Sequence, residues 1–104
     1  MRIGTDILDL KEFPDYIEGN EKRFFQDNFT ENEIKHTLLK KSPNMEFSRL
    51  FSIKESLIKA DNKLLNTNFN CIEILSKNGS ISFRNCNISS SIGGDYCISI
   101  VVSI

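Results

Sequence analysis

Residues 51–60 read FSIKESLIKA and form the most regular helical pattern in the chain. The pattern continues on both sides, which predicts a helix from about Met45 to about Leu65. Its apolar stripe consists of Phe47, Leu50, Phe51, Leu57 and Ile58. A separate polar stripe consists of Ser48, Ser52, Glu55, Lys59 and Asn62. Glu55 and Lys59 are four residues apart and are therefore close neighbours on the helix surface.

The flanking segments predict a mixed fold. Residues 2–10 alternate as a strand does, with Asp6 on the same face as Gly4 and Leu8. Residues 11–29 carry weaker helical signals, interrupted at Gly19-Asn20, and Thr30 with Glu33 forms a capping box that begins a helix to about Lys41. Residues 72–83 predict a hairpin turning at Asn78-Gly79, Ser89–Asp95 a loop and turn, and residues 96–104 a final strand. This order indicates a single α+β domain over residues 1–104.

Composition excludes several classes of protein. The chain has 104 residues, a net charge of −1 and 39% hydrophobic residues, a balance that argues against disorder and against general nucleic-acid binding. No apolar run approaches the ~18 residues of a membrane span. The acidic N-terminus does not resemble a signal peptide. Three cysteines, an odd number, fit a reducing compartment, so a soluble cytoplasmic protein is expected.

Charge is unevenly distributed along the chain. The first 34 residues are strongly acidic, whereas residues 35–63 carry an excess of basic side chains. This division fits either a solvated surface or a region that binds an anionic ligand.

Three groups of residues have chemical potential. Asp6 and Glu55 offer the two carboxylates that Mg²⁺ takes alongside phosphates and water; alternatively, Glu55 only pairs with Lys59 on a solvated helix face. A cluster of cations could hold a phosphorylated ligand beside a metal or merely form a basic solvated helix surface: Lys54 and Lys59 with Arg49, Lys40 and Lys41. A third group, Ser89–Ser91 with Gly93-Gly94, forms either a phosphate-contacting loop or an ordinary turn.

Several motifs resemble those of one enzyme family. Ile3–Leu10 resembles the opening strand of the holo-acyl-carrier-protein synthases, the single-domain type of 4′-phosphopantetheinyl transferase. Arg23-Phe24 and Phe29–Glu33 fit the segments that follow, and Phe51–Ala60 fits the family's most specific motif, Phe-x-x-Lys-Glu-x-x-x-Lys-Ala. Ile72–Ile74 with Gly79, and Gly94–Tyr96, resemble its later motifs. The resemblance implies antiparallel strands packed against a long helix.

The resemblance also implies an activity. Such enzymes transfer the 4′-phosphopantetheine arm of coenzyme A to a serine of apo acyl carrier protein and release 3′,5′-ADP, which is relevant to fatty acid biosynthesis. By position, Asp6 and Glu55 would be the Mg²⁺ ligands. Lys59 would stabilise charge at the phosphates or assist removal of the serine proton, so that Lys59 and Glu55 are the catalytic candidates. Lys54, Arg49 and Ser91 would contact substrate, and a homotrimer is implied.

The chain departs from the family at several positions. Ile92 stands where the family has a histidine that contacts coenzyme A, and Leu50 where an arginine precedes the motif phenylalanine. Arg49 lies one position earlier, about 100° around the helix. Glu12 replaces an arginine that docks on the carrier. Each lost charge-assisted contact costs about 1.5–3 kcal/mol, so a non-catalytic binding or scaffold protein is the alternative.

Overall fold

The helix predicted around residues 51–60 is α3, which extends from Pro43 to Ala60 in the computed structural model. The structure describes residues 1–77 and 80–104. The other elements, in chain order, are β1 (Arg2–Asp9), η1 (Leu10–Glu12), α1 (Lys22–Asn28), α2 (Glu31–Leu38), η2 (Asn62–Leu64), η3 (Phe69–Cys71), β2 (Leu75–Lys77), β3 (Ser80–Phe83), β4 (Cys86–Gly93) and β5 (Tyr96–Ser103). The predicted α+β class is confirmed.

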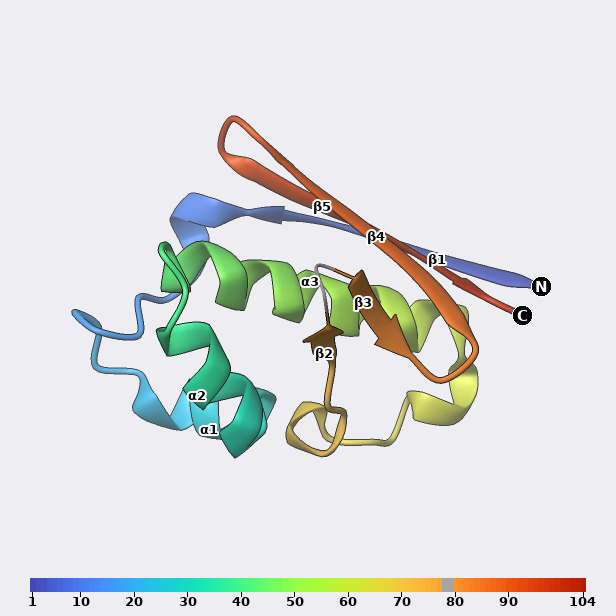
Figure 1. Ribbon diagram of the computed structural model, residues 1–104, viewed down its shortest axis with the longest axis horizontal. Helices are drawn as coiled ribbons and strands as arrows, with labels where there is room; N and C mark the ends of the chain where they lie inside the picture. Colours follow the sequence, from blue (N-terminus) through green and yellow to red (C-terminus); the bar gives the residue numbers. More distant parts are fainter. Residues whose placement is uncertain (78–79) are drawn as a thin grey trace.

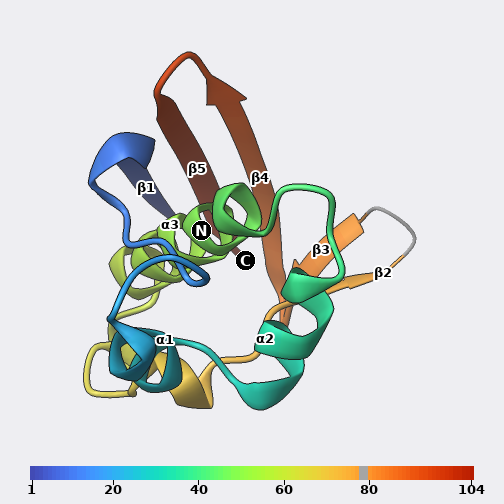
Figure 2. The ribbon, with the colours of Figure 1, turned by 90° about the vertical axis from the view of Figure 1, so that its left-hand side faces the viewer.

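The strands of the described part form one antiparallel sheet in the order β1-β5-β4-β3-β2. Helix α3 lies between this sheet and the two short helices α1 and α2 (Figures 1 and 2). Its contacts with the sheet are mainly with β1 and β5. The N-terminal strand is therefore held directly against the central helix, although 33 residues separate the two in sequence.

The contact between β1 and α3 is unusually close because its side chains are small. A Cβ atom on Gly4 would lie 2.7 Å from the backbone nitrogen of Ala60 and closer still to the carbonyl oxygen of Ser56. Ser56 and Ser52 are fully buried, and both of their hydroxyls lie within hydrogen-bond distance of the Ser99 hydroxyl on β5, at 2.6 and 2.8 Å respectively. Of the predicted polar stripe, Ser52 and Lys59 thus face the sheet.

Two apolar clusters stabilise this arrangement. One lies between α3 and the sheet and includes Ile53, Leu57, Ile72 and Val101. The other is aromatic and centres on three buried phenylalanines, Phe25, Phe29 and Phe47. Aromatic edge-to-face pairs such as Phe25 with Phe47, whose ring centroids lie 5.0 Å apart, add to the burial of apolar surface. The second cluster fixes α1 against the N-terminal half of α3.

The apolar face of β5 points away from the helix. Ile98 and Ile100 are 47% and 43% exposed, whereas Cys97, Ser99 and Val101 are buried against α3. Ile7 lies opposite Ile98 in the sheet and is 64% exposed. The outer face of β1 and β5 is therefore apolar and accessible in the isolated chain.

Several predicted boundaries differ from the structure. Helix α3 ends at Ala60 and not at the predicted Leu65, because the Asp61 carboxylate caps the short helix η2. Helix α2 ends at Leu38, three residues before the predicted Lys41. Residues Ser89–Ser91 lie within β4 and do not form the predicted loop. The predicted Asn78-Gly79 turn lies outside the described residues. None of the described helices has the length and apolar character needed to cross a membrane.

Candidate active site

Asp6 is the carboxylate that β1 places against α3. Its side chain is only 15% exposed, so it requires polar partners. Ser52 donates its hydroxyl to Asp6 Oδ2 at 2.9 Å, and Lys59 Nζ lies 3.3 Å from Asp6 Oδ1. Asp6 is thus held by two side chains that stand seven residues apart, two turns, on the same helix.

Lys59 links the helix to the strand while remaining half exposed. Its ammonium group donates to the backbone carbonyl of Thr5 at 2.9 Å as well as to Asp6. An ammonium carries three protons, so one remains for a further acceptor. With 51% of its side chain accessible, Lys59 can reach a ligand that approaches from solvent.

Glu55 lies one turn before Lys59 on α3. Partial burial raises the pKa of the Glu55 carboxyl, the nearby Asp6 carboxylate raises it further, and Lys59 opposes both effects. Two carboxylates that disfavour each other's charge, balanced by one lysine, form a site at which a divalent cation would be stabilised. Asp6 and Lys59 are therefore in direct contact, and Glu55 lies close enough for the charges of both to affect its pKa.

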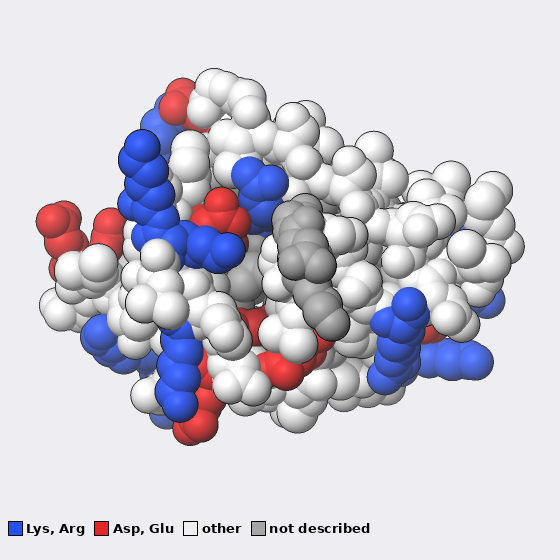
Figure 3. All heavy atoms as spheres, viewed as in Figure 1, with Lys and Arg blue, Asp and Glu red and all other residues white. Residues whose placement is uncertain are grey.

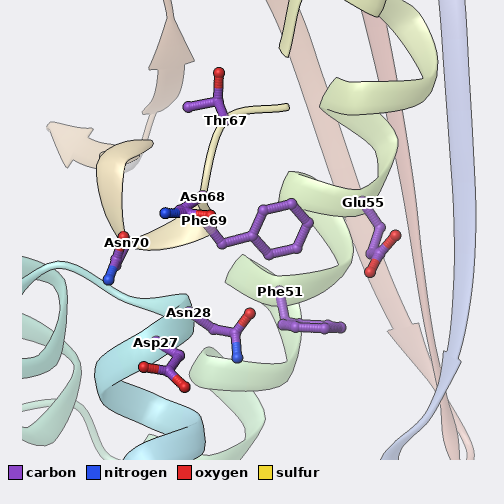
Figure 4. Close-up of a pocket in the computed structure, with 8 residues that line it drawn as sticks. All are labelled: Asp27, Asn28, Phe51, Glu55, Thr67, Asn68, Phe69 and Asn70. Atoms are coloured by element: carbon purple, nitrogen blue, oxygen red, sulfur yellow. The ribbon is translucent and has the colours of Figure 1, made fainter. Parts of the chain in front are cut away.

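Glu55 also borders a surface hollow of about 520 Å³ between α3, the end of α1 and the segment around η3. Figure 4 shows Phe51, Phe69 and Asn28 around this hollow and Glu55 at its edge, on the side of β1. The remaining lining residues are polar: Asp27, Thr67, Asn68 and Asn70. A ligand held at Glu55 would therefore have amide-lined space beside it.

Lys54, predicted to contact substrate, has a structural role instead. It is completely buried, and its ammonium donates to the Glu33 carboxylate at 2.6 Å and to the carbonyls of Asn28 and Phe69 at 2.8 Å each. These three bonds use all its protons. Burial lowers the pKa of Lys54, and the Glu33 carboxylate counteracts that effect. Because adjacent residues are rotated by about 100° around a helix, Lys54 points into the protein although Glu55 next to it faces the hollow.

The other two predicted contact residues lie apart from this group. Arg49 Nη1 donates to Ser90 Oγ at 3.2 Å, and Arg49 Nε lies 3.7 Å from a Glu46 carboxylate oxygen. Ser91 lies opposite Ile98 in the sheet and is exposed on the outer face of β4. Within one chain, neither residue contacts Asp6, Glu55 or Lys59 through any of the described hydrogen bonds or ion pairs.

Two features of the site had not been predicted. Ser52 was placed on the polar stripe with Glu55, but its bond to Asp6 depends on the packing of β1 across the helix. The Asn-rich segment 68–70 carries no motif, and it becomes a wall of the hollow only through the fold. Helical periodicity thus identified the face of α3, whereas the contacts made by that face are long-range.

The site fits a hard divalent cation by its donor chemistry. Mg²⁺ is commonly bound by one or two carboxylates, with water and substrate phosphates completing its shell. Asp6 and Glu55 meet that description. No group of three or more His, Cys, Asp or Glu side chains that could hold a metal occurs among the described residues. A cation held by Asp6 and Glu55 would take its remaining ligands from water and a bound substrate.

The fold is α+β, and Asp6, Glu55 and Lys59 lie where β1 packs on α3 (the β1–α3 seam). Two carboxylates that can hold a cation, beside an accessible lysine, form an arrangement suited to a phosphorylated ligand. The sequence model of the 4′-phosphopantetheinyl transferase superfamily matches residues 2–101, nearly the whole chain, so the protein belongs to this superfamily. A comparison with curated proteins gives no match.

Holo-[acyl-carrier-protein] synthases are among the solved structures with the same fold. The Neisseria meningitidis protein has 22% identity and a TM-score of 0.82, with 99% of this chain and 97% of that chain covered. The Chronobacterium ammoniagenes protein, solved as a complex with CoA, has 20% identity and a TM-score of 0.79, with coverages of 96% and 93%. The Thermotoga maritima protein has 22% identity and a TM-score of 0.79; 99% of this chain matches only 64% of that longer chain.

Proposed function

We propose that this protein transfers the 4′-phosphopantetheine arm of coenzyme A to a serine hydroxyl of an apo acyl carrier protein and releases 3′,5′-ADP. The observation that carries this proposal is the convergence of Asp6, Glu55 and Lys59 at the β1–α3 seam, within the matched region of a transferase superfamily. The CoA complex of the similar Chronobacterium ammoniagenes protein supports coenzyme A as the donor.

Asp6 and Glu55 are the proposed ligands of Mg²⁺. The cation would neutralise charge on the pyrophosphate and on the leaving group when it is bound. In the chain itself, the Ser52 hydroxyl orients Asp6 by its bond to Oδ2. That bond leaves Oδ1, which Lys59 approaches from the solvent side, as the more accessible carboxylate oxygen.

Lys59 is the proposed residue for charge stabilisation. In the transfer, a bond forms between the serine oxygen and the phosphorus that carries the pantetheine arm, and the bond from that phosphorus to 3′,5′-ADP breaks. Negative charge develops on the phosphate oxygens, and an ammonium held by Thr5 and Asp6 is already oriented when this happens. The serine proton passes to a base or to water at the same site, and Lys59 is the residue proposed to assist its removal.

A homo-oligomer, as a trimer, is the proposed assembly. The outer face of β1 and β5 exposes Ile3, Ile7, Ile98 and Ile100, and no charged residue stands among the outward positions from 3 to 7 and from 98 to 102. In Figure 3 the side over β4 and β5, at the upper right, is largely uncharged, whereas charged side chains lie mainly at the left and along the lower side. Apolar patches of this kind mark contact surfaces.

Such an assembly would give Arg49 and Ser91 a place in the site. Ser91 lies on the outer face of β4, and Arg49 bonds the neighbouring Ser90. Ser91 and Arg49 lie on opposite faces of β4, so a second copy would have to pack along β4 to bring its own Asp6 and Glu55 near both. We propose Arg49 and Ser91 as substrate contacts across subunits. We also propose a cytoplasmic location, in accord with the three free cysteines.

A mass-shift assay tests the function. The protein is incubated with coenzyme A, Mg²⁺ and several apo carrier proteins, and the carrier is weighed by mass spectrometry. The proposal predicts the gain of one phosphopantetheine arm, its loss with EDTA, and its loss in Asp6→Asn and Glu55→Gln. No gain with any carrier, together with no binding of coenzyme A, would favour the non-catalytic binding protein that Ile92, Leu50 and Glu12 suggest.

A further inference from the structure

Lys54 joins the walls of the hollow next to Glu55. Its ammonium bonds the carbonyl of Asn28, the last residue of α1, and the carbonyl of Phe69, the first residue of η3. Asn28 and Phe69 both line the hollow. One buried side chain on α3 therefore fixes both opposite walls relative to the helix that carries Glu55.

The third partner of Lys54 is held equally firmly. Glu33 is 2% exposed and accepts hydrogen bonds from the backbone nitrogens of Thr30 and Ile74 at 2.9 and 2.8 Å. Thr30 closes the capping box and also donates to Glu73 at 2.6 Å. Glu33 thus anchors Lys54 to the start of α2 and to the segment before β2, which leaves the ammonium no freedom to shift.

A second, weaker tether joins the same two walls at the surface. The side-chain amide of Asn70 donates to the carbonyl of Gln26 on α1 at 3.2 Å. The ring centroids of Phe51 and Phe69, which both line the hollow, lie 5.5 Å apart in an edge-to-face contact. None of the three η3 residues is fully buried, so the segment is held by these contacts together with the packing of Phe69 and of Ile72, the residue after η3, in the core cluster.

We propose that Lys54 is a positioning residue that sets the width of the hollow and so places the substrate group that enters beside Glu55. It does so through the carbonyls of Asn28 and Phe69 and without touching substrate. The expected effect of Lys54 on KM rests on the proposed function. The expected effect of Lys54 on the rigidity of residues 66–71 is independent of that function.

The test variant removes the bonds from Lys54 to the carbonyls of Asn28 and Phe69 (the clamp) without leaving a buried charge unpaired. Lys54→Met alone strands the Glu33 carboxylate, so Lys54→Met is combined with Glu33→Gln. The matched control is Val101→Ala, which creates a cavity in the core cluster on the other side of α3. Both proteins are compared at temperatures where each is folded.

Amide hydrogen exchange gives the first readout. The double variant should exchange faster at residues 66–71 than wild type, while Val101→Ala should leave this segment protected. Asn70→Ala, an exposed substitution, should raise exchange at the same residues by a smaller factor and keeps the test available if the double variant does not fold. Unchanged exchange at residues 66–71 in the folded clamp variants would overturn the inference.

Steady-state kinetics give the second readout. A misplaced binding surface should raise KM by roughly tenfold or more for the substrate that occupies the hollow, since small displacements cost up to about a hundredfold. The turnover of Val101→Ala should fall only with its folded fraction, at unchanged KM. Equal KM values in all folded variants would contradict a positioning role. If wild type transfers nothing, the proposed function fails, and hydrogen exchange alone decides the role of Lys54.

Discussion

Replacing Gly4 by alanine tests whether the close contact between β1 and α3 builds the site. The added Cβ would lie 2.7 Å from Ala60 N, whereas ordinary contact begins at 3.4 Å, so the strand must move by about 0.7 Å or more. Ser56 lies nearer still and is helix backbone, so it cannot rotate aside.

The displacement has two consequences of predictable size. The hydrogen bonds from Ser52 to Asp6 and from Lys59 to Thr5, both 2.9 Å, would lengthen to about 3.6 Å, which is too long for a hydrogen bond. Overpacking costs roughly 1–3 kcal/mol of unfolding free energy. A domain of this size loses roughly 4–8 °C in Tm for each kcal/mol.

Thermal denaturation followed by circular dichroism, together with the transfer assay below Tm, measures both consequences. The matched control is Gly93→Ala on β4, where an added Cβ meets nothing within 4 Å and should leave Tm unchanged or slightly higher. Gly4→Ala should lower both Tm and the transfer rate of the folded protein. Equal Tm and equal transfer for the two variants would refute the close packing of β1 on α3 as the basis of the site.

Three further predictions concern the site and the outer face. Glu55→Gln should abolish transfer and yet raise Tm at pH 7. The folded state raises the pKa of Glu55, so ionising this carboxyl lowers the free energy of unfolding. This loss of stability is absent below the ordinary pKa of 4.5 and grows as the pH rises to the raised pKa. A Tm gain that persists undiminished at pH 4 would contradict this cause. Lys59→Met should lower kcat by roughly 10²–10³-fold, and a wild-type kcat in this variant would remove Lys59 from the mechanism. Ile98→Asp should convert the oligomer to monomers in light scattering, and an unaltered assembly would move the interface elsewhere.

The sequence was sufficient to predict most of the elements and to single out three candidate site residues. Helical spacing over residues 51–60 placed Glu55 and Lys59 on one face, and strand alternation placed Asp6 among apolar neighbours. That Asp6 meets this face of α3 depends on Gly4 and on the buried serines, whose contacts span more than 40 residues. Periodicity alone does not encode such pairings; the resemblance to the synthases supplied them.

Lys54 shows where local pattern fails. Its neighbours Glu55 and Lys59 are accessible, and a run of charged residues on a helix usually faces solvent. The structure buries Lys54 because Glu33 and two helix-end carbonyls converge on it from segments 15 to 26 residues away. In the same way, the final strand shows two clean faces, but only packing on α3 decides that the small face is buried and the isoleucines are exposed.

Calorimetric titration of coenzyme A shows whether Asp6 and Glu55 form the binding site, because binding requires neither a carrier protein nor turnover. We expect binding that requires Mg²⁺, is lost with EDTA, and weakens by roughly tenfold or more in Asp6→Asn and Glu55→Gln, since each 1.4 kcal/mol of lost interaction is tenfold in affinity. Binding of equal strength without Mg²⁺, or in both carboxylate variants, would contradict the assignment of the β1–α3 seam as the site.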